Sequence, residues 1–407
     1  MAKFNEIQIK TTLNYFKVLF FSSLLGSLNS IIPIPGNFLG FNLSGYAWIL
    51  VFLVSIHYLL YIIKKSYFPF KIWVFWFVIL FFYLIIDFSF VGLQGTLQFI
   101  VPIFVGTVTG GLKYNKATLR MILNYLKILM IITFFSTTIL SFIKYGFFGV
   151  GPATDAHLSA LSGVITLTLF YHFRQRKYIV YYFLLVLIPI LAVTRTGILV
   201  MLLIPFFHFY KLFSSIKIVL LLILFPMSIY IFYLPSVQEK MFFGGTGKIN
   251  ELVYGSDNFN TSGRSSVNEI LIKEFNKSPF FGQGPRTDYF TLERAGIELK
   301  EAHNDYLQIL TCYGVFGGLI LLLSFIFHTK VIIRFQNYSH TEKILKSTYL
   351  TLLLPFILLM ATDTVLRLTY SFMNYFFAIA GILMSVHNAN KNILKHNYEN
   401  NSSNSLI

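Results

Sequence analysis

Charged residues are scarce in this chain of 407 residues. Asp, Glu, Lys and Arg together make up 12% of the sequence, whereas a soluble domain carries about 25%. Hydrophobic residues account for 56%, and the mean hydropathy is +0.69. A sequence with so little charge cannot cover a water-facing surface. We therefore conclude that the chain is a polytopic integral membrane protein with most of its mass in the bilayer.

Cysteine and paired acidic residues are also nearly missing. The single cysteine, Cys312, excludes an internal disulfide and a metal cage built from thiolates. No Asp-x-Asp pair or acidic cluster with metal-ligand spacing occurs in the segments that we place outside the membrane. The sequence therefore favours chemistry that needs neither a metal ion nor another cofactor.

Acidic residues are too few to balance the basic ones, and the formal net charge is +16. The basic residues gather in segments predicted to face the cytoplasm, while the short links near residues 35–43 and 90–92 contain no Lys or Arg. This alternation follows the positive-inside rule and places the amino terminus in the cytoplasm. No basic cluster forms a continuous groove, so the charge reflects topology and we expect no nucleic-acid partner.

Long apolar runs dominate the sequence. A helix needs about 20 apolar residues to cross roughly 30 Å of hydrocarbon, and the sequence contains twelve such runs. Their predicted limits are residues 15–34, 44–63, 73–90, 93–110, 121–142, 157–173, 179–193, 197–213, 216–234, 306–327, 345–361 and 371–386. We therefore predict an all-α polytopic membrane protein with about twelve transmembrane helices.

The twelve spans divide the chain into four parts. Residues 1–234 contain the first nine transmembrane helices, and residues 303–388 contain the last three. Between the ninth and tenth helices, residues 235–302 form the one large loop, which the topology places outside the cytoplasmic membrane. The tail, residues 389–407, is rich in Asn and Ser and is predicted to be disordered in the cytoplasm.

The large loop contains the pattern of a short amphipathic helix. Ser266 and Glu269 fit a capping box, and apolar residues then recur on one helical face. The predicted helix ends near Asn276, before Pro279. Arg264 lies just before the predicted start, where free backbone N–H groups and the positive end of the helix dipole favour an anion.

Three elements of the sequence carry a resemblance to a known family. An arginine begins an external helix, a Gly-Arg pair and a glycine-rich turn lie in the large loop, and a His-Asn pair closes the loop. Their residues, in chain order, are Arg195, Leu199, Gly263, Arg264, Pro279, Gly282, Gly284, His303, Asn304, Leu307 and Gly314. In order, spacing and topology these elements resemble the O-antigen ligase/polymerase superfamily, the Wzy/WaaL-type membrane glycosyltransferases of bacterial surface polysaccharides.

The resemblance implies an enzyme of the GT-C class in the bacterial cytoplasmic (inner) membrane, with its active site facing the periplasm. It further implies a metal-independent glycosyltransferase whose donor is an oligosaccharide linked to undecaprenyl diphosphate. A sugar hydroxyl of the acceptor attacks the anomeric carbon, and the lipid diphosphate leaves. Membrane lipid, a chain-length regulator and a flippase are further partners that the resemblance implies.

Three residues are the predicted catalytic groups. Negative charge grows on the leaving diphosphate, and a planar guanidinium grips phosphate oxygens in pairs, so Arg195 and Arg264 are assigned to it. His303 is assigned as the base that accepts the proton of the attacking hydroxyl. Arg286 and Arg367 are lesser candidates for contact with phosphate or sugar.

The motif positions Asn304, Gly263, Gly282 and Gly284 are assigned to substrate binding by the resemblance. Each assignment has a structural alternative. The two glycines of the turn could serve as turn formers alone, and Arg195 could anchor a helix end at the lipid headgroups. The histidine of the motif could simply mark the border between loop and helix.

Three external carboxylates and one further histidine lie outside the motifs. Asp87, Asp155 and Asp363 could bind sugar hydroxyls, and His157 lies near the start of the sixth predicted span. Nothing in their spacing ranks them with the motif residues.

Two acceptors fit the resemblance. A polymerase transfers the glycan to another lipid-linked repeat unit of an O-antigen or capsule, and a ligase transfers it to a lipid A core. We favour the polymerase because the large loop is compact and shows no further acceptor-binding domain. A lipid-linked oligosaccharide flippase or another transporter is less favoured, because the spans hold almost no charged residues to line a route.

Overall fold

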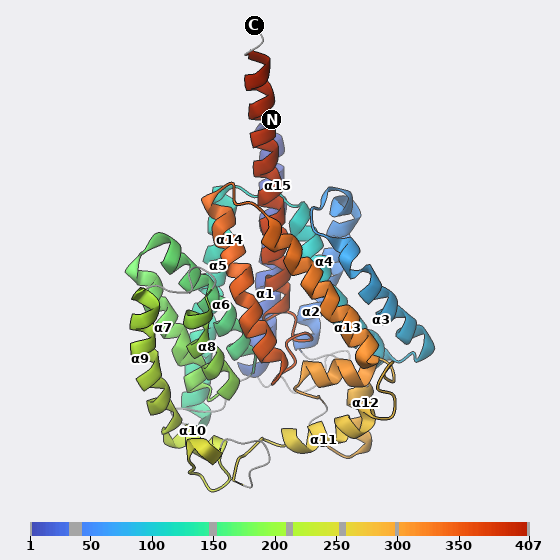
Figure 1. Ribbon diagram of the computed structural model, residues 1–407, viewed down its shortest axis with the longest axis vertical. Helices are drawn as coiled ribbons and strands as arrows, with labels where there is room; N and C mark the ends of the chain where they lie inside the picture. The colour runs from blue at the N-terminus through green and yellow to red at the C-terminus, as the bar shows by residue number, and fades with distance from the viewer. Residues whose placement is uncertain are drawn as a thin grey trace.

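The computed structural model describes residues 2–31, 43–145, 153–208, 215–251, 258–297 and 301–404 (Figure 1). Within these ranges the chain forms α-helices and short 3-10 helices joined by turns and loops, and no β-strand is present. The prediction of an all-α fold is confirmed.

Twelve of the α-helices each overlap one predicted span. Their bounds are α1 Ala2–Ile31, α2 Leu43–Ile62, α3 Val74–Ile86, α4 Phe90–Gly111, α5 Lys116–Tyr145, α6 Ala153–Phe173, α7 Arg176–Leu191, α8 Arg195–Phe207, α9 Ser215–Phe232, α13 Asp305–Arg334, α14 His340–Met360 and α15 Met373–Asn404. The predicted external loop contains α10 Pro235–Met241, α11 Arg264–Phe275 and α12 Thr287–Arg294. The 3-10 helices are η1 Ile63–Lys65, η2 Phe70–Trp73 and η3 Ile249–Glu251.

Six stretches of the described residues are long and apolar enough to cross a membrane. They are Gly45–Lys65, Phe90–Gly111, Lys116–Ile139, Ala156–Phe173, Asp305–Arg334 and His340–Met360. Leu222–Phe232 and Pro235–Met241 meet at a bend of 67°, and they give a seventh span if the two helices are counted together. Helices α3 and α8 have 13 residues each, fewer than the about 20 that cross the hydrocarbon. Twelve membrane crossings therefore stay a prediction.

The chain ends and the large loop lie at opposite ends of the helix bundle. Figure 1 shows the amino terminus and the carboxyl end of α15 at the top, and α10, α11 and α12 at the bottom. This arrangement agrees with a topology in which the termini and residues 235–302 are on opposite sides of the membrane.

Helices α4 and α15 pack closely in the centre of the bundle. A Cβ atom added at Gly381 would lie 2.1 Å from Thr109 Oγ1 and 2.4 Å from the carbonyl oxygen of Gly106. Backbones approach this closely only where side chains are absent or small. The segment before α15 also contacts α4, because Arg367 Nε donates to Gln98 Oε1 at 3.2 Å.

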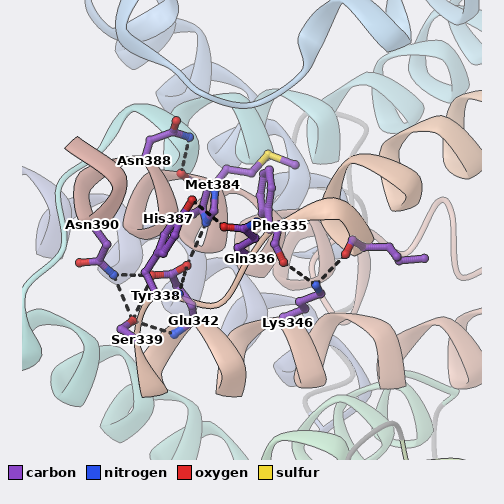
Figure 2. A network of polar contacts seen from close by, with 11 residues as sticks. Phe335, Gln336, Tyr338, Ser339, Glu342, Lys346, Met384, His387, Asn388 and Asn390 are labelled. Atoms are coloured by element: carbon purple, nitrogen blue, oxygen red, sulfur yellow. Dashed lines mark hydrogen bonds and ion pairs between the residues drawn. The ribbon is translucent and has the colours of Figure 1, made fainter. Parts of the chain in front are cut away.

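A polar network joins α13, α14 and α15 at the end away from α10–α12 (Figure 2). His387 Nδ1 lies 2.9 Å from Glu342 Oε2, and the imidazole stacks with the rings of Phe335 and Tyr338. Ser339 caps α14 by accepting a hydrogen bond from the backbone N–H of Glu342. Because Glu342 is fully buried, this network fixes three helices whose other ends carry the candidate site.

Helix α15 extends farther than the sequence predicts. The sequence predicts a disordered tail over residues 389–407, whereas the structure continues α15 to Asn404. Asn390 supports the first turns of this extension, because its side-chain amide donates to Ser339 Oγ at 3.0 Å (Figure 2). Asn388 in turn donates to Met384 O at 2.8 Å. Polar side chains that suggest disorder thus bind partners on the helix itself and on α14.

Helix α11 is the amphipathic helix predicted in the loop, but the predicted capping box is not its start. The helix begins at Arg264 and its N-cap is Gly263, which has φ 77° and no side-chain cap. This left-handed backbone favours glycine. It ends the preceding loop at Gly263, so the helix starts before the predicted capping residue Ser266. Thr261 Oγ1 accepts from Ser265 N at 3.3 Å instead. Arg264 is therefore the first helical residue and not the residue before the helix.

Candidate active site

The glycine-rich turn of the loop packs into a break in α13. Gly314 interrupts the helix with non-helical backbone angles, φ 65° and ψ −173°. In the turn, Gly284 N donates to Cys312 O at 2.8 Å. A Cβ atom at Gly282 would lie 2.5 Å from the backbone atoms of Cys312 and Gly314. The two turn glycines therefore fix the loop on α13, and their role in substrate binding stays a prediction.

A small apolar core holds α11 and α12 on the start of α13. Its buried members are Val267, Leu271, Leu292, Ala302 and Leu307. Arg264 lies one helical turn before the first of these residues. His303 follows Ala302 directly. The same core thus positions both the arginine and the histidine of the motifs.

Arg195 begins α8 and connects it to the segment before α11. Its guanidinium donates to the carbonyl oxygen of Asn260 and, at 2.9 Å, to Ser262 Oγ. It also lies 5.8 Å from the ring centroid of Phe259. These contacts bring Arg195 near Arg264, which is close enough to act on it electrostatically.

Lys240, a residue outside the motifs, completes a group of three cations, which we call the cationic cluster (Arg195, Lys240 and Arg264). Its ammonium donates to Val193 O at 2.5 Å. Burial, and then the charges of Arg195 and Arg264, lower the pKa of Lys240 to about 8. Within the described residues no carboxylate pairs with any of the three. Cations without a counter-charge attract anions, so the cationic cluster is a candidate anion site.

A second group, the histidine–aspartate cluster (His157, His303 and Asp363), joins three segments that are distant in sequence. Asp363 Oδ1 lies 3.4 Å from His303 Nδ1, and its Oδ2 lies 3.2 Å from His157 Nε2. His157 Nδ1 is also 3.0 Å from Ser371 Oγ. The His157 side chain is fully buried, whereas that of His303 is 28% exposed. His303 is therefore the member of the cluster that a substrate can reach.

The backbone of His303 is unusual. Its φ of 45° lies in the left-handed region, which residues with a side chain rarely adopt outside special sites. The next residue, Asn304, caps α13, since its Oδ1 accepts from Leu307 N at 3.1 Å. The capped helix and the left-handed backbone together fix the imidazole beside Asp363.

Asp363 stays ionised in this arrangement. Burial alone would raise the pKa of its carboxyl, but His157, His303 and the N–H group of Thr364 outweigh burial and lower that pKa. A fixed negative charge beside Nδ1 of His303 holds the proton there and leaves Nε2 as the nitrogen that can accept one. In the described part of the chain, no group of three or more His, Cys, Asp or Glu residues has the arrangement of a metal site.

Two buried arginines lie next to the histidine–aspartate cluster. Arg367 Nη2 donates to Glu301 Oε1 at 3.0 Å, and its Nε contacts Gln98 of α4. Arg286 is 5% exposed. Burial would raise the pKa of Glu301, but Arg367, then Arg286 and His303, lower it overall. Arg367 is ion-paired with Glu301, whereas Arg286 Nε lies 3.5 Å from Asp288 Oδ1.

A comparison with known protein families matches residues 180–322 to the family model described as O-antigen ligase. The segment is similar to this family, and we call it the matched domain. The match confirms the resemblance that the three sequence elements indicate. It supports a membrane enzyme of the O-antigen ligase/polymerase type, with a glycosyltransferase-like activity. No curated protein matches the chain.

The matched domain contains the cationic cluster and His303 but not the partners of His303. It extends from α7 into α13. His157 precedes the domain, and Asp363 and Arg367 follow it. The candidate site is therefore built by the domain together with helices on both sides of it.

The predicted site residues fall into two groups in the structure. Arg264 acts electrostatically on Arg195, and His303, Arg286 and Arg367 all act electrostatically on Glu301. Within the described ranges no hydrogen bond or ion pair joins the two groups, and the small apolar core of α11, α12 and α13 connects them.

Reasoning from sequence missed four contributors to the site. It leaves Asp363 and His157 unranked, and it does not single out Lys240 or Glu301. The predicted topology places Asp363 and His157 at the same membrane face as His303. That shared face is the signal from which their meeting could have been inferred.

Proposed function

We propose that the protein is the polymerase of a bacterial surface polysaccharide of the O-antigen or capsule type. It transfers a glycan from undecaprenyl diphosphate to a hydroxyl group of another lipid-linked repeat unit. The transfer takes place at the outer face of the cytoplasmic membrane and uses no metal. One observation carries the proposal: the matched domain holds both a cationic cluster without counter-charge and a histidine beside a buried carboxylate, and one small apolar core positions the two.

His303 is the base in this proposal. The acceptor hydroxyl approaches Nε2, because Nδ1 is engaged by Asp363. As the hydroxyl oxygen bonds to the anomeric carbon, its proton passes to Nε2. The ionised Asp363 stabilises the imidazolium that results. His157 lies on the other oxygen of the same carboxylate and keeps it in place.

The cationic cluster receives the leaving group. The bond between the anomeric carbon and the diphosphate oxygen breaks, and its electron pair leaves with the lipid diphosphate. Arg195 and Arg264 stabilise the growing charge with paired hydrogen bonds, and Lys240 adds a point charge. A diphosphate thus supplies the negative charge that these side chains lack in the described structure.

Helix α11 connects the two parts of the reaction. Its first residue is Arg264, and its apolar face packs beside Ala302, the residue before His303. A donor with its diphosphate on the cationic cluster therefore places its first sugar along the start of α11, toward the base.

The external segment favours the polymerase over the ligase. Its described residues form α10, α11, α12 and one 3-10 turn, which rest on the bundle and make no separate domain for a lipid A core. A ligase that uses a lipid A core is the second candidate, because the matching family is described by that activity.

Purified protein mixed with the lipid-linked repeat units of its own host, and with no other acceptor, tests the proposal. We expect a ladder of polymer lengths and the release of undecaprenyl diphosphate in proportion to each bond formed. Transfer that occurs only after a lipid A core is added would assign the ligase. Movement of the repeat unit across a vesicle membrane without any transfer would contradict an enzyme and identify a flippase.

A further inference from the structure

A small polar cavity lies between the first turns of α2 and α4 and the segment that leads into α15. Its volume is about 130 Å³, and we call it the α2–α4 cavity. Its walls include Trp48, Gln94, Gln98, Glu301, Arg367 and Tyr370. A single water needs only about 10–15 Å³ of such space. The cavity therefore has room for a ligand the size of one sugar ring.

Two buried hydrogen-bond donors in the walls have no partner among the described residues. They are Trp48 Nε1 and Arg367 Nη1. Trp48 is 5% exposed and Arg367 is 6% exposed, so bulk water does not satisfy them. Buried polar atoms without partners are rare and costly in folded proteins. Trp48 and Arg367 both line the α2–α4 cavity, so a ligand with acceptor oxygens complements its walls.

The chemistry of the walls selects a neutral, hydroxyl-bearing ligand. Arg367 is paired with Glu301, and these are the charged residues of the lining, so the cavity has no net charge to attract a phosphate or a cation. The amides of Gln94 and Gln98, the carboxylate and the guanidinium supply both donors and acceptors. Trp48 adds an apolar ring face beside them. A sugar matches such walls, because it has hydroxyl groups as well as an apolar face.

Glu301 connects the α2–α4 cavity to the proposed base, because His303 acts electrostatically on this wall residue. Glu301 lies in the wall and precedes His303 by two residues. Its second carboxylate oxygen accepts from Thr364 Oγ1 at 3.4 Å, next to Asp363. We propose that this cavity binds a neutral sugar of the acceptor saccharide and holds its hydroxyl for His303, an inference that rests on the proposed function.

The acceptor is assigned to the cavity because the donor has its own anchor. The diphosphate of the donor belongs to the cationic cluster, and no residue of that cluster lines the cavity. Two walls come from α2 and α4, which precede the matched domain in the chain. Acceptor selection therefore depends on residues outside the matched domain.

The first test measures binding of the free repeat-unit oligosaccharide, released by mild acid from the lipid-linked intermediate of the host. Added to the purified full chain, it should change tryptophan fluorescence in a saturable way. The response should disappear in Trp48→Phe and persist in Trp76→Phe, a matched change in the core. Gln94→Ala should weaken binding by about tenfold, as the loss of one buried hydrogen bond does. Identical titrations of wild type and Gln94→Ala, with a response that survives in Trp48→Phe, would overturn the assignment.

The second test separates this inference from the proposed function. With the oligosaccharide varied as acceptor at fixed donor, Gln94→Ala should raise the acceptor KM about tenfold and leave the donor KM unchanged. If wild type forms polymer and the variant keeps its acceptor KM, the cavity assignment fails and the polymerase stands. A raised donor KM would instead assign the cavity to the donor sugar and overturn the acceptor assignment. If the saccharide binds as expected but wild type transfers nothing to it or to lipid-linked repeat units, the proposed function fails and the cavity stands only as a saccharide site.

Discussion

Asp363→Asn should remove most of the catalytic rate without changing the shape of the site. The carboxylate lies 3.4 Å from His303 Nδ1 and 3.2 Å from His157 Nε2, and it is 6% exposed. An amide has the same size, but it offers one acceptor oxygen where the carboxylate offers two. Its NH₂ group would donate to one of the imidazoles. If that imidazole is His303, the proton moves to Nε2 and the nitrogen that faces the acceptor is no longer a base.

The size of the effect follows from the role of the base. General base catalysis contributes about 10²–10⁴-fold in rate. The contact of Asp363 with His303 is long for a hydrogen bond, so we place the loss in the lower part of this range, at about 10²–10³-fold. That loss corresponds to about 3–4 kcal/mol of transition-state stabilisation. Binding of the donor should be unchanged, because the cationic cluster is intact.

A double-mutant cycle gives the decisive assay. Single-turnover transfer is measured for His303→Ala, Asp363→Asn and the double variant. The double variant should be no slower than His303→Ala alone, because a carboxylate that orients a base has no effect once the base is gone. Losses that multiply would refute the reasoning and give Asp363 an independent role. Glu269→Gln is the control, since Glu269 is an exposed carboxylate on α11 that pairs with Lys273 at 2.7 Å.

Three further predictions concern the cationic cluster and the topology. Arg195→Lys and Arg264→Lys should each lose most polymer formation while the protein inserts and accumulates normally, because Lys lacks the planar fork that grips a diphosphate; near-normal chain length in both would leave only a general electrostatic role. Donor binding should weaken as the pH rises through about 8. The pKa of Lys240 is lowered to about 8, and its charged form, present below that pH, attracts the diphosphate. Lys240→Met should flatten this pH dependence, and an unchanged profile would remove Lys240 from the site. In the cysteine-free chain, Glu239→Cys should react with an impermeant thiol reagent on intact spheroplasts and Asn337→Cys should not; the reverse labelling would overturn the topology.

Much of the fold can be predicted from the sequence, because membrane helices correspond to long apolar runs. Each of the twelve predicted spans overlaps one helix, since burying an apolar run in lipid requires its backbone to form internal hydrogen bonds. Helix length across the membrane is harder to predict. The helical stretch Phe70–Ile86, which joins η2 to α3, and α8, Arg195–Phe207, are both shorter than the about 20 residues that cross the hydrocarbon. The start of α11 was also missed, because a left-handed Gly263 decides it and a capping pattern does not reveal backbone angles.

The site could be predicted only in part. The motif residues Arg195, Arg264 and His303 lie at external ends of predicted helices, so their chemistry could be proposed from the sequence. The partner of His303 could not be identified in the same way, because Asp363 is 60 residues away in sequence and belongs to no recognisable spacing. Lys240 could not be identified from the sequence either. Its placement depends on how α10 turns back toward the start of α8, where its ammonium donates to Val193 O.

The pH–rate profile of His303 variants tests the central claim most directly. Turnover of a defined lipid-linked donor is measured against pH for wild type, His303→Ala and His303→Gln. If His303 takes the proton of the acceptor hydroxyl, the Ala variant should lose about 10²–10⁴-fold in rate, with donor binding nearly intact. The Gln variant should recover little of that loss, and the fall in rate at acid pH should vanish in both variants. A Gln variant within a few-fold of wild type, with its acid limb preserved, would contradict the account.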